Sequence, residues 1–416
     1  MKPGHVQALV LAALVLVAGC TGGGTGLVDT TAPEDGYRTI IDSRGVAVQV
    51  PTHIERVVTA SAGLIEGTML VLGEEEKIVG VGSVCVQKIS DCTVPTVSGE
   101  IYEYRGGMEP VTYLSPRIRD LPLVGEGTTM NYETLTGLDP DVVILRVTTS
   151  MEDEGVQKMI RTVESLGIPL VVLKGPRCFD EPDISTISDE IRILGAVFGK
   201  EQKASELAEY LESQTQMIFE RTKDIPDSER PTVIVFGASP TSRQAGGAGM
   251  VRGTDMIESY FIEEIVHAKN AFRNAGRPTI SAEQLLALDP DAIVLDTCMG
   301  YHPPEELYSA PYYQNVGELS AIKNHRVYAL PWTCRSTKRL EYPIHVMVIA
   351  KAAYPERFAD IDLGEWLLDY YKNVYGVDDE TAKALRSAQW MDWCVGGWAP
   401  ARGSSSEADP SYQRVP

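Results

Sequence analysis

A short sequence occurs twice in this chain, once on each side of a long amphipathic stretch. Residues 132–145 and residues 282–295 both carry an acidic residue at their second position, pass through Leu-Asp-Pro-Asp and end in an apolar run. This order predicts a short helix, a tight corner and a strand in each copy. A duplicated unit of this kind favours two related α/β lobes; the alternative is that Leu-Asp-Pro-Asp is simply a common helix-to-strand corner.

The stretch between the two copies, residues 201–223, predicts one long helix. Ala204, Leu207, Leu211 and Ile218 fall on one helical stripe, and charged residues occupy the other faces. At 1.5 Å per residue such a helix reaches about 35 Å, the width of a small domain. A chain of 416 residues is long for a single core. We therefore expect two lobes joined by one helix.

The N-terminus predicts the compartment. Lys2 precedes an apolar run, residues 8–17, that is too short to span a membrane and is typical of a signal peptide. Small residues then lead to Cys20, and a Gly-rich segment follows, which resembles a lipoprotein cleavage box. We expect residues 1–19 to be the signal peptide, Cys20 to be lipidated, and residues 20–36 to be a flexible tether that anchors the protein outside the cytoplasm.

The composition excludes one class of partner. A formal net charge of −21 argues against nucleic acid, because binding to phosphates needs a basic face. The alternative is an acidic surface unrelated to function.

Six cysteines remain after Cys20, and an even number outside the cell favours disulfides. Cys85 and Cys92 are close enough in sequence to close one loop. Cys298 and Cys334 both follow apolar runs in the second half and could meet at neighbouring strand ends. Metal binding by these thiols is the alternative, but no C-x-x-C spacing supports it.

Several motifs occur in an order that resembles a known family. They are Asp42–Pro51, Val57-Val58, Leu72–Val81, Leu138–Ile144, Gly199-Lys200, Ser281–Leu295, Val327–Pro331 and Ala350–Phe358. Together they are similar to the substrate-binding proteins of ABC importers for ferric siderophores, haem and cobalamin, the helical-backbone periplasmic binding proteins. Each motif is weak alone, and their order and spacing over about residues 38–375 carry the resemblance.

The resemblance implies a fold of two α/β lobes with parallel-rich sheets, joined by one long helix, with the ligand in the cleft between them. The expected parts are an N-terminal lobe at 37–182, connecting helices at 183–228, a C-terminal lobe at 229–375 and a partly disordered extension at 376–416. It also implies that Glu133 and Glu283, one per lobe, dock into basic pockets of the permease. The alternative is that both acids only favour the start of a helix.

Ligands of such sheets lie beyond the carboxyl ends of the strands, so the loops there are the candidate site. Arginine recognises carboxylate, catecholate or phosphate oxygens, and aromatic rings offer flat apolar surfaces. The candidate ligand-binding residues are Tyr102, Tyr104, Arg105, Arg146, Arg243, Arg252, Arg277, Tyr301, His302, Trp332, Arg335 and Arg339. The alternative for these arginines is that they are solvated loop residues.

This set suits an anionic, partly aromatic iron chelate, a ferric siderophore. Cobalamin or haem is the alternative cargo, with His302 or Tyr301 as an axial ligand, and a surface scaffold or sensor that serves no importer is an alternative function. We expect no cofactor and no metal site of the protein's own, because few histidines remain to converge with a carboxylate. No catalytic motif of a hydrolase, metalloprotease or nucleotidase is present, so we expect a monomeric binding protein and not an enzyme.

The C-terminal extension departs from the family. Trp390, Trp393 and Trp398 are expected to pack it on the second lobe, with Cys394 in a disulfide, and a lid over the cleft is the alternative. The polar end from residue 403 is expected to be disordered.

Overall fold

The structure of the protein is a computed structural model that describes residues 36–95, 101–179, 183–237, 248–296, 304–309, 316–332, 339–396 and 401–403. Contacts divide the chain into Met1–Gly36 and Tyr37–Pro416, and every helix and strand named below belongs to the second unit. The expected signal peptide and Cys20 lie outside the described residues. Within the described part, no helix combines the length and apolar character needed to cross a bilayer.

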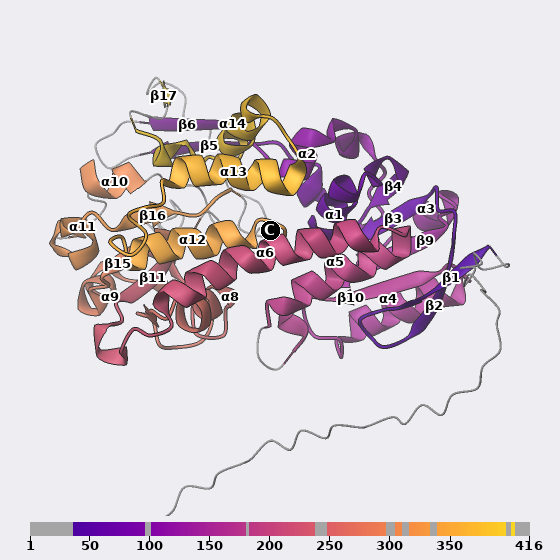
Figure 1. The fold of residues 1–416 in the computed structure, drawn as a ribbon, viewed down its shortest axis with the longest axis horizontal. Coiled ribbons are helices and arrows are strands. Elements are labelled where there is room, and N and C mark those ends of the chain that lie inside the picture. Colours follow the sequence, from indigo (N-terminus) through magenta and orange to yellow (C-terminus); the bar gives the residue numbers. More distant parts are fainter. Residues whose placement is uncertain are drawn as a thin grey trace, which may run out of the picture. The chain divides into compact units, whose positions relative to one another are not determined.

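Four parallel strands form the first sheet, in the order β10–β9–β3–β4 (Figure 1). Their bounds are β3 Val57–Ala60, β4 Ile78–Val81, β9 Val142–Val147 and β10 Leu170–Lys174. The helices of this part are α1 Leu64–Leu72, α2 Pro110–Leu114, α4 Glu154–Ser165 and α5 Ser185–Phe198. All six residues of β9 are buried, as expected of a central strand in a sheet covered on both faces.

The second sheet has the order β14–β12–β11–β15–β16, and β13 also pairs with β11. Strands β11, β13, β15 and β16 run parallel, while β12 and β14 are antiparallel to their neighbours. The strand bounds are β11 Thr232–Gly237, β12 Gly249–Val251, β13 Lys269–Asn270, β14 Thr279–Ile280, β15 Ala292–Leu295 and β16 Val327–Ala329. The helices of this part are α8 Ile257–Tyr260, α10 Pro304–Ser309, α11 Ser320–Lys323 and α12 Tyr342–Ala353. The prediction of parallel-rich α/β sheets is confirmed.

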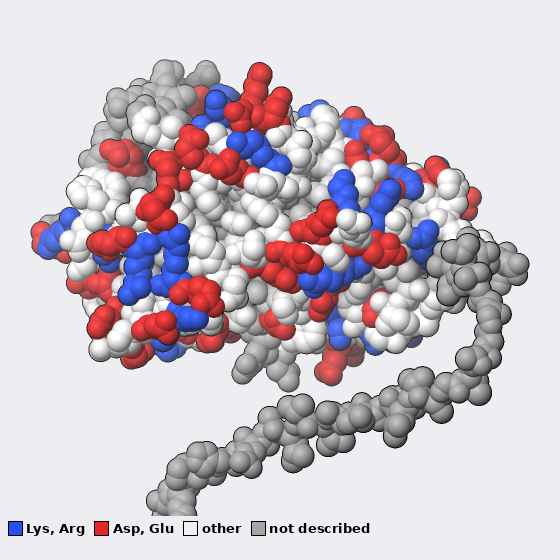
Figure 2. All heavy atoms as spheres, viewed as in Figure 1, with Lys and Arg blue, Asp and Glu red and all other residues white. Residues whose placement is uncertain are grey.

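The predicted connecting helix is α6, Glu201–Thr222. The four residues expected on its apolar stripe are buried, and α6 contacts α5, α1 and α12 (Figure 1). Its apolar stripe belongs to a core cluster that also contains Val57 of the first sheet and Val233 of the second. Figure 2 shows acidic and basic side chains interspersed on the face that carries α6.

The repeated sequence has one structural role in both copies. The first copy forms α3, Tyr132–Gly137, and β9; the second forms α9, Ala282–Leu288, and β15. The first Asp of each corner, Asp139 and Asp289, adopts a positive φ, of 45° and 35°. The second Asp of each corner accepts hydrogen bonds at the start of the neighbouring parallel strand: Asp141 from the Glu55 and Arg56 amides, Asp291 from the Thr232 amide and hydroxyl. The motif therefore ties each helix–strand unit to the adjacent strand.

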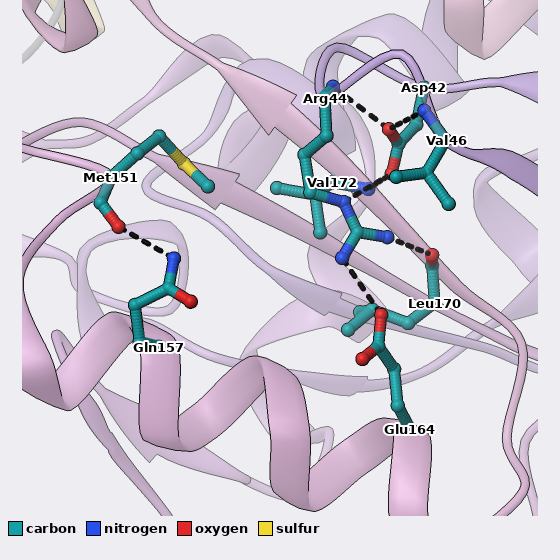
Figure 3. A network of polar contacts seen from close by, with 8 residues as sticks. All are labelled: Asp42, Arg44, Val46, Met151, Gln157, Glu164, Leu170 and Val172. Atoms are coloured by element: carbon teal, nitrogen blue, oxygen red, sulfur yellow. Dashed lines mark hydrogen bonds and ion pairs between the residues drawn. The ribbon is translucent and has the colours of Figure 1, made fainter.

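The predicted opening hairpin consists of β1, Tyr37–Ile41, and β2, Ala47–Pro51. Figure 3 shows how Asp42 holds it: one carboxylate oxygen accepts from the Arg44 and Val46 amides, and the other from Arg44 Nε and the Val172 amide of β10. Arg44 also donates to Glu164 of α4 at 2.8 Å. The motif that begins at Asp42 therefore holds the hairpin against the first sheet.

The C-terminal extension contacts more of the fold than expected. Helices α13, Leu363–Tyr375, and α14, Asp379–Ala388, are followed by strand β17, Ala401–Gly403, which pairs with β6, Ile101–Gly107, beside β5, Ser90–Pro95. Helix α14 contacts α2 and β6, which belong to the first lobe, residues 37–182. The expectation that the tryptophans pack the extension on the second lobe is met for Trp390 and Trp393, which contact residues of the second sheet, but the extension also contacts the first lobe.

Candidate ligand-binding site

The expected ligand loops follow strands of both sheets, and part of them is not described. Arg243, Tyr301, His302 and Arg335 lie outside the described residues, as do Cys298, Cys334 and Trp398. Tyr102 lies in β6, where only its backbone is described. The site can therefore be built from the remaining residues.

Arg146 lies near the carboxyl end of β9 and points into the interior. Its Nε and Nη2 atoms donate to the two carboxylate oxygens of Glu190 on α5, at 2.6 and 2.7 Å, and the two side chains are 2% and 1% exposed. Burial raises the pKa of the Glu190 carboxyl, and the charge of Arg146 opposes that rise. Arg146 therefore lies in a buried bidentate pair within the core and not in an open strand-end loop as expected.

Arg252 and Asp296 form a second buried pair. Arg252 directly follows β12, Asp296 directly follows β15, and Arg252 Nε donates to Asp296 Oδ2 at 2.6 Å. The side chains are 6% and 7% exposed. This pair links two strand ends of the second sheet, so Arg252 also acts within the fold and not in an open loop as expected.

Arg339 is the third buried arginine, and Glu109, Glu341 and His345 are buried near it. It pairs with Glu109, the residue that precedes α2, and both side chains are almost fully buried. The guanidinium packs so closely on Gly63 that a Cβ there would lie 2.7 Å from Arg339 Nε. Two residues on, Glu341 accepts a hydrogen bond from the Tyr375 hydroxyl. Arg339 therefore joins the first and second lobes and lies in the core, not in an open loop as expected.

Burial shifts the ionisation of this cluster. It raises the pKa of Glu341 to about 7, with the nearby Glu109 carboxylate adding to the rise and the Tyr375 hydrogen bond and Arg339 opposing it. Burial also lowers the pKa of His345 to about 3, helped by the charge of Arg339, so this imidazole is neutral at pH 7.

Two of the predicted arginines remain at the surface. Arg105 in β6 is 69% exposed and lies 2.9 Å from Glu103 and 3.6 Å from Asp91. Arg277 is exposed just before β14. Among the described candidate arginines, these two have an exposed side chain that a solute could contact.

Two of the predicted aromatic residues, Tyr104 and Trp332, contact Trp390 of the C-terminal extension. Trp390 lies between Tyr104 and Trp332, with ring centroids 5.4 and 4.6 Å apart. Tyr104 is buried and Trp332 is half-buried. The three rings thus connect β6 with the residue that follows the last strand of the second sheet. No sequence signal placed Trp390 here, because its neighbours are more than 50 residues away in the chain.

The disulfide predictions are wrong for the cysteines that the structure describes. Cys85 and Cys92 are not joined: Cys92 lies in β5 with a buried side chain, and Cys85 lies in the turn before that strand. Cys394 is a free thiol that donates to the Met391 carbonyl, and burial raises its pKa to about 12. Among the described residues, no group of three or more His, Cys, Asp or Glu side chains is placed to hold a metal ion.

Glu133 and Glu283 hold equivalent, exposed positions in the first turns of α3 and α9. Other residues cap these helices: Asn131 accepts from the Thr134 amide, and Ser281 and Gln284 form a reciprocal capping box. Helix capping therefore does not require the two glutamates.

One further hollow lies against α5, with a cavity volume of about 360 Å³. It is lined by Ser43, Lys174, Phe179, Thr186, Asp189, Arg192 and Ile193. It contains none of the candidate ligand residues, so we do not place the ligand there.

Comparison with known proteins identifies the class. A family model described as periplasmic binding protein matches residues 58–332, well over half of the chain. The chain therefore belongs to the periplasmic binding protein family, which confirms the resemblance seen in its sequence. That family and fold are those of solute-binding proteins rather than enzymes.

Individual relatives share only a low sequence identity with this chain. The chain is 24% identical over 369 residues to the molybdate-binding protein MolA of Haemophilus influenzae, covering 84% of this chain and 94% of the relative. It is 26% identical over 235 residues to the uncharacterized ABC transporter substrate-binding lipoprotein YvrC of Bacillus subtilis, covering 56% and 67%. The crystal structure of a periplasmic solute binding protein from Veillonella parvula has a TM-score of 0.66 at 19% identity and covers 86% of this chain and 98% of that one. At this identity the structural likeness shows the fold.

Proposed function

We propose that this protein is the extracytoplasmic solute-binding component of an ABC importer and that it carries an iron chelate, a ferric siderophore. The observation that carries the importer role is the pair of exposed glutamates, Glu133 and Glu283, at equivalent places in the two sheets' helix–strand units. A protein that presents one acid on each half can dock on a permease with basic pockets. The permease and its ATPase are the partners, and the protein is a monomer.

The cargo is proposed from the chemistry of the remaining candidate residues. Arg105 and Arg277 are exposed, and the sequence places Arg243 and Arg335 after strands of the second sheet. Guanidinium groups suit the oxygens of a catecholate or carboxylate chelate. Cobalamin and haem are alternative cargoes of the same role.

A second candidate is a small oxyanion. It is favoured by the alignment with the molybdate-binding protein over 84% of this chain. Arginine side chains can donate hydrogen bonds to a tetrahedral oxyanion as well as to a chelate. Both candidate cargoes are anions, and they differ in size.

We also propose a lipid anchor at Cys20, so that the protein works at the outer face of the cytoplasmic membrane. The small residues before Cys20 and the Gly-rich segment after it support this. The relative from Bacillus subtilis is also called a lipoprotein.

The cargo can be identified from protein purified from its native host, by mass spectrometry, metal analysis and visible absorption. A ferric siderophore is expected to give bound iron, an organic mass and a charge-transfer band. Molybdenum without an organic mass would favour the oxyanion, and a Soret or corrin band would favour haem or cobalamin. Titration of the purified protein with all four classes without any binding would contradict the proposed function.

The docking role makes a prediction of its own. Reversing both charges, Glu133→Lys with Glu283→Lys, is expected to abolish import, because each half would then repel a basic pocket. Cargo affinity is expected to stay within about twofold, since both residues are exposed and neither is among the candidate ligand-binding residues. Import of radiolabelled cargo into cells and calorimetric titration of the purified protein measure the two effects.

The matched control is Glu154→Lys with Glu365→Lys. These acids are also exposed in the first turns of helices, α4 and α13, so the control makes the same change in net charge. Import that survives reversal at 133 and 283, or that falls equally in the control, would favour a scaffold or sensor without an importer.

A further inference from the structure

The end of α14 contacts two segments of the chain, one just after β6 and one just after β16. The Ala388 carbonyl accepts from the Met108 amide at 3.0 Å, just beyond β6. The next carbonyl, Gln389, accepts from the Trp332 amide at 2.9 Å, just beyond β16. Two consecutive peptide groups therefore join segments that are more than 200 residues apart in the chain. We call residues 388–390 the clasp.

Trp390 completes the clasp with its side chain. Its ring lies between Tyr104 and Trp332, and its Nε1 donates to the Arg105 carbonyl at 3.2 Å. The fit is tight, because a Cβ added at Gly107 would lie 2.5 Å from the Trp390 ring and 3.0 Å from that of Trp332. A buried core cluster accordingly contains Tyr104 and Trp390 together with Phe236 and Leu295 of the second sheet.

The backbone of Trp390 is held in a conformation that its side chain disfavours. Its φ is 53°, in the left-handed region, where a bulky residue is rare and glycine is usual. The Trp390 amide donates to Ser387 O and the Met391 amide to Arg386 O, the pattern in which glycine normally ends a helix. A tryptophan at a glycine position costs conformational energy, which the packing of its ring must offset.

We propose that Trp390 is a positioning residue for cargo binding: it fixes β6 and the segment after β16, which carry Arg105 and Trp332, at one separation. The clasp lies beyond residue 332, where the family match ends. The effect on cargo rests on the proposed function, whereas the coupling of the two segments does not. With both segments held in the absence of cargo, binding needs little closure and loses less free energy to ordering.

The test is hydrogen–deuterium exchange of the whole mature protein in four forms: wild type, Trp390→Gly, Trp390→Phe and Trp393→Ala. Glycine suits the left-handed backbone, so Trp390→Gly removes the ring without adding strain. We expect exchange in peptides covering 101–108 and 327–332 to rise together, by about tenfold or more. Trp390→Phe is expected to restore most of the protection.

Trp393 is the matched control, because it lies in the same extension but packs edge-to-face against Tyr328 of β16, with centroids 5.7 Å apart. Its replacement is expected to loosen 327–332 alone. Exchange confined to residues 379–396 in Trp390→Gly, or equal loosening of both segments in Trp393→Ala, would overturn the clasp. Thermal unfolding of each variant checks that it is folded.

Calorimetric titration with molybdate and with a ferric tris-catechol complex gives the second readout. We expect Trp390→Gly to weaken whichever probe the wild type binds by about tenfold and Trp390→Phe by no more than about threefold. Unchanged affinity in a variant whose two segments have loosened would overturn the positioning role. If the wild type binds neither probe, the proposed cargo fails, and exchange alone decides the coupling.

Discussion

Replacing Arg146 with methionine is expected to lower the free energy of unfolding by about 3–5 kcal/mol, because it leaves a buried carboxylate without its partner. Glu190 is fully enclosed on α5 and receives both of its strong hydrogen bonds from Arg146. Methionine fills similar space but cannot donate, so Glu190 must either stay charged in the core or take up a proton. Urea unfolding at pH 7 measures the loss.

The double variant Arg146→Met with Glu190→Leu is the control. It removes both charges, and replacing a buried pair with apolar side chains is often close to neutral, so we expect it to recover most of the stability. A single variant that is fully stable but binds cargo more weakly would return Arg146 to the ligand site. The same result in the double variant as in the single one would show that packing, and not the unpaired charge, causes the loss.

Arg146 also shows where sequence reasoning stops. Its place after four apolar strand residues correctly predicted a strand end, and a chain with a net charge of −21 made an arginine there conspicuous. The acid that neutralises it is 44 residues away, in the middle of α5, and nothing in the spacing pairs the two. Arg252 with Asp296 and Arg339 with Glu109 repeat the case at similar or greater separations. A loop arginine and a core arginine differ only in tertiary partners, which no local pattern contains.

The elements that the sequence predicted correctly are those whose pattern lies within one short segment of the chain. The stripe on α6 has helical period, and the opening hairpin combines strand alternation with a tight turn. In the two Leu-Asp-Pro-Asp corners, the first Asp, Asp139 or Asp289, itself adopts the positive φ of the corner. The clasp has no such signal, because Trp390 occupies a backbone conformation for which sequence would choose glycine.

Replacing Glu341 with glutamine is expected to remove a loss of stability that Glu341 causes in the wild type as pH rises from about 4.3 to 7. Burial raises the pKa of Glu341 to about 7 in the folded protein, against about 4.3 in an unfolded chain. The folded state therefore binds a proton more tightly, so the stability that this group contributes is present at low pH and is lost as pH rises from about 4.3 through 7. The size of the full change is about 4 kcal/mol, and above pH 7 it levels off.

His345 acts in the opposite sense, so the wild-type profile alone does not isolate Glu341. The pKa of His345 falls to about 3 on burial, so its contribution to stability grows as pH rises from about 3 to 6.5. The difference between the two proteins removes this common term: relative to wild type, Glu341→Gln should gain about 3 kcal/mol between pH 4.5 and pH 8. Glutamine keeps an oxygen for the Tyr375 hydroxyl, and Glu380→Gln, at an exposed position on α14, makes the same chemical change without burial. Parallel urea-unfolding profiles for wild type and Glu341→Gln from pH 5 to 8 would mean that Glu341 keeps its charge in the core, stabilised by Arg339.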